Sequence, residues 1–157
     1  TLRQNMRCDE DPARALQAMN HQMFNAADGT QFATLALLIW QADGRLTYVN
    51  AGHLPPMVRD GSGSVQWLKP EPNVALGLMP DPEFRVQATR LEVGETLMLF
   101  TDGLSEARAD EGFFGKDRAA SALGRAKTAT GVVQALEAFM GSPCDADDVA
   151  TLTLGRR

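Results

Sequence analysis

The chain has 157 residues, of which 44% are hydrophobic and 22% are charged, and this composition indicates a globular protein with a sizeable core. It excludes disordered and fibrous classes. Fifteen Lys and Arg residues against 20 Asp and Glu residues give a formal net charge of -5. No run of like charge is long enough for an interaction tail, so we expect neither nucleic acid nor an anionic membrane surface as a partner.

The cysteines and the apolar stretches indicate the cellular compartment of the protein and whether it enters a membrane. Cys8 and Cys144 lie far apart, without a C-x-x-C pair or a nearby His, so neither a zinc site nor a disulfide framework is indicated. The longest apolar stretch, residues 32–40, covers nine positions. A membrane-spanning helix needs roughly 20 apolar residues. The first 11 residues do not resemble a signal peptide. We therefore expect a cytoplasmic protein without membrane insertion.

The elements expected from the N-terminus are one helix followed by hairpins. Asp11-Pro12 marks the start of a helix over residues 12–25, whose apolar residues recur at helical spacing. Three antiparallel pairs follow, each joined by turn residues: 32–41 with 46–50, 57–59 with 65–68, and 84–91 with 96–101.

After residue 103 the pattern becomes helical, with helices expected over 116–125 and 130–140 and a last strand over 149–154. This segregated order predicts an α+β fold in which helices pack on the faces of antiparallel sheets. No internal repeat or low-complexity linker interrupts the chain, so we expect a single domain over residues 1–157.

The first candidate for chemistry is Asp102, which follows an apolar strand and precedes Gly103. A carboxylate at a strand end is held by the sheet and can face a crevice. The alternative interpretation is an ordinary turn, in which Asp102 caps the backbone that follows.

The second candidate is Asp145-Ala146-Asp147-Asp148, which leads directly into the last expected strand. Neighbouring acids repel one another unless cations, hydrogen bonds or water offset their charge. Mg²⁺ and Mn²⁺ prefer carboxylate and water oxygens, so two acidic strand ends brought together would make a metal cleft. The alternative is a solvated acidic loop.

The third candidate is Asn50-Ala51-Gly52-His53, where a strand ends in small residues and a single His. Gly52 permits close approach of another backbone. A lone His after a strand is more often a structural hydrogen-bonding residue than a ligand or a base. The sequence contains no G-x-S-x-G or phosphate-binding glycine motif, so carboxylates are the main chemical candidates.

Taken together and in order, these motifs resemble the metal-dependent PPM-type protein serine/threonine phosphatases of the bacterial SpoIIE/RsbU-like branch. The matching segments are Phe32-Ala33-Thr34-Leu35, residues 44–53 with Pro55-Pro56, Leu76-Gly77-Leu78, residues 99–107, Phe114-Gly115 and Asp147-Asp148-Val149. Each motif alone is weak, and their order and spacing make the match specific.

The resemblance implies an α-β-β-α sandwich of two antiparallel sheets with a binuclear Mn²⁺ or Mg²⁺ centre. The acid of the Thr-Asp-Gly motif and the first acid of the Asp-Asp motif are metal ligands in that family, which carries over to Asp102 and Asp147. Gly103 would let the backbone turn beside the metal. Asp148, Asn50 and His53 also match family positions and are candidates for supporting the site.

The family domain also has an earlier part that supplies further ligands, including an Asp-x-x-Gly-His-Gly-type segment. This sequence contains no matching segment. By resemblance, the chain therefore corresponds to the later part of the domain, is N-terminally incomplete, and holds only half of the expected metal cage. This fragment by itself is then expected to lack full activity.

The activity implied is hydrolysis of phosphoserine and phosphothreonine in a bacterial signalling cascade that regulates sigma factors. A metal-activated water would attack phosphorus without a covalent enzyme intermediate. The implied substrate is a phosphorylated anti-sigma-factor antagonist, and the implied context is a possible homodimer with an N-terminal sensor or receiver domain. Two alternatives stay open: a catalytically inactive phosphatase-like binding module that docks a signalling partner, and another Mg²⁺-dependent phosphoryl-transfer enzyme.

Overall fold

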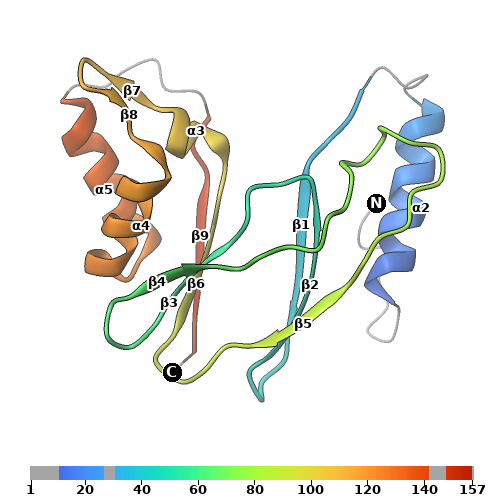
Figure 1. The fold of residues 1–157 in the computed structure, drawn as a ribbon, viewed down its shortest axis with the longest axis horizontal. Helices are drawn as coiled ribbons and strands as arrows, with labels where there is room; N and C mark the ends of the chain where they lie inside the picture. The colour runs from blue at the N-terminus through green and yellow to red at the C-terminus, as the bar shows by residue number, and fades with distance from the viewer. Residues whose placement is uncertain (1–10, 27–30, 142–147, 157) are drawn as a thin grey trace. The chain divides into compact units, whose positions relative to one another are not determined.

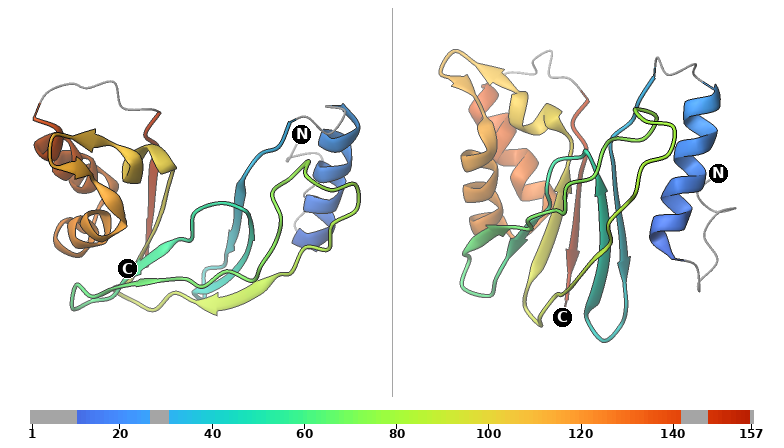
Figure 2. Two further views of the ribbon diagram at one scale, coloured as in Figure 1. Left: turned by 45° about the horizontal axis from the view of Figure 1, so that its top comes forward. Right: turned by 45° about the vertical axis from the view of Figure 1, so that its right-hand side comes forward.

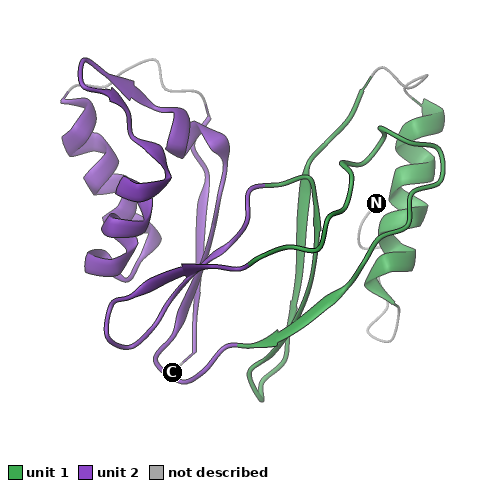
Figure 3. Ribbon diagram, in the orientation of Figure 1, with its two compact units in different colours: residues 1–53, 69–90 green, residues 54–68, 91–157 purple. Residues whose placement is uncertain are grey.

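The computed structural model describes residues 11–26, 31–141 and 148–156. The chain divides into two compact units (Figure 3). Unit 1 comprises residues 1–53 and 69–90, and unit 2 comprises residues 54–68 and 91–157. The expectation of a single domain stays a prediction. No helix in the described ranges combines the length and the apolar character that crossing a bilayer requires.

The described residues of unit 1 form a helix and a three-stranded antiparallel sheet (Figures 1 and 2). The helix is α2 (Pro12–Ala26), and the strands in sheet order are β1 (Leu35–Trp40), β2 (Arg45–Ala51) and β5 (Gln87–Arg90). In the β1–β2 pair, Leu35 lies opposite Ala51 and Trp40 lies opposite Leu46. The expected first helix and first hairpin are therefore confirmed.

The core of unit 1 forms where α2 packs against this sheet. Apolar residues three and four positions apart share one face of a helix, and this face of α2 is turned to the core. The buried cluster consists of Leu16, Leu37, Val49, Ala51, Leu76 and Phe84. Asn20 lies in the same helix and is also buried. Its Oδ1 accepts from the Gly77 N–H at 2.8 Å and its Nδ2 donates to the Met79 carbonyl at 2.9 Å. Asn20 thus fixes the loop after residue 76 to α2.

Unit 2 contains a four-stranded antiparallel sheet with two longer helices on one face (Figures 1 and 2). The strands in sheet order are β4 (Val65–Trp67), β3 (Met57–Arg59), β6 (Thr96–Phe100) and β9 (Thr151–Gly155). Between β6 and β9 lie α3 (Asp102–Glu106), the β7–β8 hairpin (Arg108–Ala109 and Gly112–Phe113), α4 (Gly115–Ala126) and α5 (Ala129–Met140). The second expected hairpin, both later helices and the last strand are confirmed.

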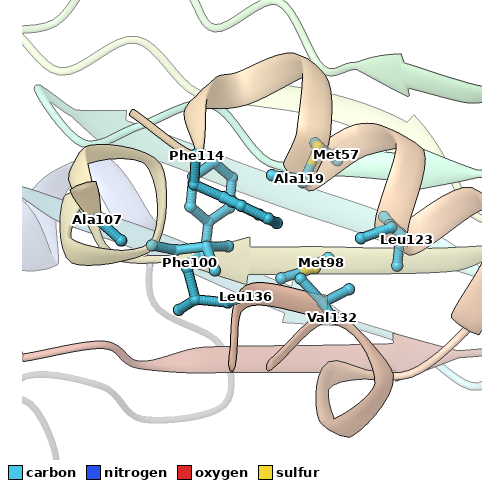
Figure 4. Close-up of a cluster of buried hydrophobic side chains, with 11 residues drawn as sticks. Met57, Met98, Phe100, Ala107, Phe114, Ala119, Leu123, Val132 and Leu136 are labelled. Atoms are coloured by element: carbon cyan, nitrogen blue, oxygen red, sulfur yellow. The ribbon is translucent and has the colours of Figure 1, made fainter. Parts of the chain in front are cut away.

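The core of unit 2 gathers around strand β6 (Figure 4). Met98 and Phe100 of β6 are buried among Leu104, Leu123 and Val132 from the helices. Each fully buried side chain of this size contributes about 1.5–3 kcal/mol relative to exposure. β6 pairs with β3 over residues 96–98 and with β9 over residues 96–100, so β9 holds its end at Phe100.

The expected third hairpin, residues 84–91 with 96–101, is wrong. β5 pairs with β2, whereas β6 pairs with β3 and β9. The turn between them does form, since the Glu95 N–H donates to the Glu92 carbonyl at 3.0 Å. However, Gly94 and Glu95 exchange backbone hydrogen bonds with Arg156, and the two strands enter different sheets. The local alternation of residues cannot distinguish these partners.

The turn between β3 and β4 is closed by one carboxylate. The Oδ1 of Asp60 accepts from the Ser62 N–H and hydroxyl, the Gly63 N–H and the Ser64 N–H, at 2.7 to 3.0 Å. These bonds, above all that of the Ser62 hydroxyl, lower the pKa of Asp60 below 3.8. They favour the ionised form of Asp60, so the stability of this hairpin depends on pH.

We therefore predict that Asp60→Ala lowers the free energy of unfolding, and that the loss depends on pH. A carboxyl group in an unfolded chain has a pKa of about 3.9. Because the folded pKa is lower, the stabilisation is fully present above that pH and is lost as the pH falls through the folded pKa. Urea unfolding of both proteins should give a constant difference between pH 5 and pH 7 that shrinks below about pH 4. A difference that stays constant at low pH would contradict the assignment.

Candidate functional site

Asp102 begins α3 one residue after the end of β6 and is exposed, while several residues close to it are buried. Phe100 is 3% exposed, and Gly103 and Leu104 are also buried. The Oδ1 of Asp102 accepts from the Gly103 N–H at 3.1 Å. Within the described part of the chain, no Lys, Arg or His forms an ion pair with this carboxylate. A negative charge is thus held on a fixed strand end and faces solvent.

Thr101 joins the end of β6 to the segment that precedes β9. Its N–H donates to the Ala150 carbonyl at 3.0 Å, and its hydroxyl donates to the Asp148 carbonyl at 3.0 Å. The same hydroxyl accepts from the Ala150 N–H at 2.9 Å. Figure 1 shows α3 beside the start of β9, in agreement with the pairing of Phe100 and Thr151. Asp148 is therefore fixed next to the residue that precedes Asp102.

The sequence candidates in unit 2 stand as follows. Asp147 lies outside the described residues, so its role as a ligand stays a prediction. Asp148 is exposed, and its backbone carbonyl is held by Thr101. Gly103 lies within α3 and has helical rather than left-handed backbone, so the turn at this point does not depend on a positive φ.

The described residues fit part of a site for a hard divalent cation. Asp102 offers carboxylate oxygens, which Mg²⁺ and Mn²⁺ prefer, and the Asp148 segment is anchored beside it. Among the residues that the structure describes, no three or more His, Cys, Asp or Glu side chains form a group able to hold a metal ion. Asp102 is thus a candidate for one ligand.

In unit 1, Asn50 closes a tight turn at the end of β2. Asn50 is 3% exposed, its Oδ1 accepts from the His53 N–H at 2.7 Å, and its Nδ2 donates to the His53 carbonyl at 2.9 Å. Gly52 within the turn has a φ of 71°, and a Cβ there would lie 3.1 Å from the Ala75 Cβ. Both polar atoms of the Asn50 amide are therefore used to hold the local backbone.

His53 is half-buried, and its Nδ1 lies 3.2 Å from the Thr34 hydroxyl oxygen. This contact links the turn to the residue just before β1. It uses one ring nitrogen in a structural hydrogen bond, which favours the structural interpretation of His53. Its role in a functional site stays a prediction.

Sequence analysis did not identify Thr101 as a site residue. Its two hydroxyl partners lie 47 and 49 residues away along the chain. A Thr before the first residue of a helix is ordinarily interpreted as a capping residue. The sequence feature that could have drawn attention to Thr101 is its place beside an acid at a strand end.

A family model described as stage II sporulation protein E (SpoIIE) matches residues 1–157, which is the whole chain. The chain belongs to the SpoIIE family. It is a PPM-type, SpoIIE/RsbU-like phosphatase domain, as its motifs indicate.

Two curated relatives of this SpoIIE-family chain are much longer than the matched region. Protein IcfG from Synechocystis sp. is 37% identical over 93 residues, which cover 58% of this chain and 14% of IcfG. The phosphoserine phosphatase RsbU from Bacillus subtilis is 26% identical over 103 residues, which cover 65% of this chain and 31% of RsbU. The match thus spans less than a third of either relative.

Solved structures confirm the α+β fold of helices with antiparallel sheets. The RsbU and RsbW domains of Rv1364c from Mycobacterium tuberculosis are 26% identical, with a TM-score of 0.76, over 99% of this chain and 45% of that one. The SiaA-PP2C domain of Pseudomonas aeruginosa is 26% identical, with a TM-score of 0.76, over 94% and 61%. The SpoIIE phosphatase domain from Bacillus subtilis, presoaked with Mn, is 16% identical with a TM-score of 0.66, covers 99% and 70%, and shows the fold alone.

The Asn50 turn leads to a prediction about stability. Asn50→Ala leaves the His53 N–H and carbonyl without their partners, and an unsatisfied buried polar group costs about 1–3 kcal/mol. His53→Ala removes only the contact with Thr34 and should cost less. Urea unfolding of both variants should therefore rank Asn50→Ala as the less stable. The opposite ranking would show that the His53 ring, rather than the Asn50 amide, holds this turn.

Proposed function

We propose that this protein is a metal-dependent phosphoprotein phosphatase that hydrolyses phosphoserine and phosphothreonine in bacterial signalling. The observation that carries the proposal is the triple contact of Thr101 with Asp148 and Ala150. It holds Asp148, the second acid of the Asp-Asp motif, beside the Thr-Asp-Gly motif, from which it is 47 residues distant in the sequence. The match of the SpoIIE family model to residues 1–157 supports a single phosphatase domain.

In this proposal, Asp102 and Asp147 are the residues of this chain that bind the metal centre. Two Mn²⁺ or Mg²⁺ ions, when bound, would supply Lewis-acid polarisation of the phosphoryl oxygens and an activated water. The Gly103 N–H orients the Asp102 carboxylate by donating to its Oδ1. Oδ2 takes no part in that hydrogen bond. The buried side chains of Phe100 and Leu104 anchor the backbone on both sides of Asp102. Asp148, Asn50 and His53 support the backbone rather than react.

The proposed substrate is a phosphorylated anti-sigma-factor antagonist, in a pathway that switches partners according to phosphorylation. The names of two similar proteins support this class of substrate: a phosphoserine phosphatase, RsbU, and a protein that carries RsbU and RsbW domains together. We also propose a cytoplasmic location. We further propose that the natural protein carries an N-terminal sensor or receiver domain and forms a homodimer.

The activity can be tested with Asp102→Asn in the protein at its full natural length. Phosphate release from a phosphoserine protein should require Mn²⁺ and stop on addition of EDTA. Loss of even an outer-shell partner costs about 10–100-fold, so loss of a ligand should reduce turnover by at least about 100-fold. Asp110→Asn, which removes an exposed acid in the β7–β8 turn of the same unit, is the matched control and should leave turnover unchanged.

The possible results separate the alternatives. Mn²⁺-dependent release that is lost in Asp102→Asn and retained in Asp110→Asn would support the phosphatase. No release by the folded protein, from a substrate that a control phosphatase cleaves, would favour the binding module. Turnover of small phosphate esters without turnover of phosphoproteins would favour another phosphoryl-transfer enzyme.

A further inference from the structure

Thr101 occupies the N-cap position of α3, but its side chain does not cap this helix. Its backbone is extended, with φ of -83° and ψ of 161°, as expected at an N-cap. The side chain of an N-cap Thr usually accepts from an N–H in the first helical turn, which stabilises the helix. No such bond is present at Thr101. The hydroxyl instead bonds the segment before β9, so its role differs from the one its position predicts.

The hydroxyl holds both ends of a short backbone segment. It donates to the carbonyl of Asp148 and accepts from the N–H of Ala150, so its donor and one acceptor site are both used. The last backbone pair of the β6–β9 ladder is Phe100 with Thr151. Thr101 therefore continues the attachment of the two strands beyond the ladder, through its side chain as well as its N–H. Restricted rotation at the branched Cβ helps to keep the hydroxyl directed at this segment.

This attachment acts between the two acidic motifs. Asp102 is the next residue after Thr101, and Asp148 is the residue whose carbonyl the hydroxyl holds. The position of the Asp148 segment relative to Asp102 therefore depends on one uncharged side chain, in addition to the Thr101 N–H bond to Ala150 and the β6–β9 ladder. Metal sites require ligands held in the correct geometry by neighbouring hydrogen bonds, and loss of such support typically costs 10–100-fold in metal affinity or activity.

We propose that Thr101 is a positioning residue, whose hydroxyl fixes the backbone at Asp148 relative to Asp102 and thereby sets the affinity of this site for a divalent cation. The inference rests on the proposed metal-dependent function. It predicts a specific defect: without the hydroxyl the acids and the β6–β9 ladder remain, but the Asp148 carbonyl and the Ala150 N–H lose the side-chain bonds that fix them beside Thr101. A purely structural hydroxyl would lower stability without changing the affinity of the folded protein for metal.

The test compares direct Mn²⁺ binding by the full natural protein and its variants, measured by electron paramagnetic resonance of free Mn²⁺. Thr101→Val keeps the branched shape and removes both hydroxyl bonds, so its dissociation constant for Mn²⁺ should rise by about 10–100-fold. Thr101→Ser keeps the hydroxyl and should bind Mn²⁺ nearly as tightly as the wild type. Phosphatase activity of Thr101→Val should recover as the Mn²⁺ concentration is raised.

Thr128→Val is the matched control because it makes the same atomic change elsewhere in unit 2. The Thr128 hydroxyl caps α5 by accepting from the Gly131 N–H at 3.2 Å. Its loss should lower the free energy of unfolding and leave Mn²⁺ binding unchanged. This control separates a loss of general stability from a loss of ligand geometry.

Asp102→Asn distinguishes failure of the inference from failure of the proposed function. If Mn²⁺ binding requires Asp102 but is unchanged in Thr101→Val, only the positioning role is overturned. If the wild type binds no Mn²⁺, or binds it equally in Asp102→Asn, the metal site and the positioning role both fail. If Thr101→Val does not fold, Thr101→Ala replaces it. Failure of both to fold assigns the hydroxyl to stability and overturns the inference.

Discussion

The pairing of β6 with β9 brings Asp102 and Asp148 to the same end of the sheet in unit 2. Antiparallel strands place the end of one beside the start of the other, and here the end of β6 carries the Thr-Asp-Gly motif. The start of β9 follows the Asp-Asp motif. Two segments distant in the sequence are therefore neighbours because of backbone hydrogen bonds alone. Thr101 then refines this proximity with a side chain.

The strand end combines a rigid base with an exposed charge. Phe100 and Leu104 are buried, and Phe100 contacts Trp67 edge to face with ring centroids 6.0 Å apart. Asp102 lies between them and stays exposed, so it keeps the hydration that an isolated carboxylate requires. Burial of the neighbours offsets the entropy lost in fixing this backbone. A carboxylate held in this way can receive a cation with little rearrangement, which is what preorganised sites need.

Local patterns predicted the local structure well. The helix at residues 12–25 and the first two hairpins depend on spacing and on turn residues within a few positions, and all three were found. The pairing of residues 84–91 with 96–101 was wrong because the choice of partner is made by distant strands, β2 and β9. Asp102 could be proposed from its place at a strand end, whereas the hydroxyl contacts of Thr101 depend on residues 47 and 49 positions away. Asp147 remains a prediction that rests on resemblance.

The division into two units has a consequence for how the chain can be altered. Residues 54–68 of unit 2 interrupt the sequence of unit 1, so the backbone passes from one unit to the other after residues 53, 68 and 90. No single break in the backbone separates the two units, because each unit consists of two segments of the sequence. Neither unit can therefore be exchanged between relatives as one continuous segment. A crossover between two relatives within residues 54–90 would divide the sequences of both units. Because of this connectivity, the two units are expected to be passed on together rather than separately.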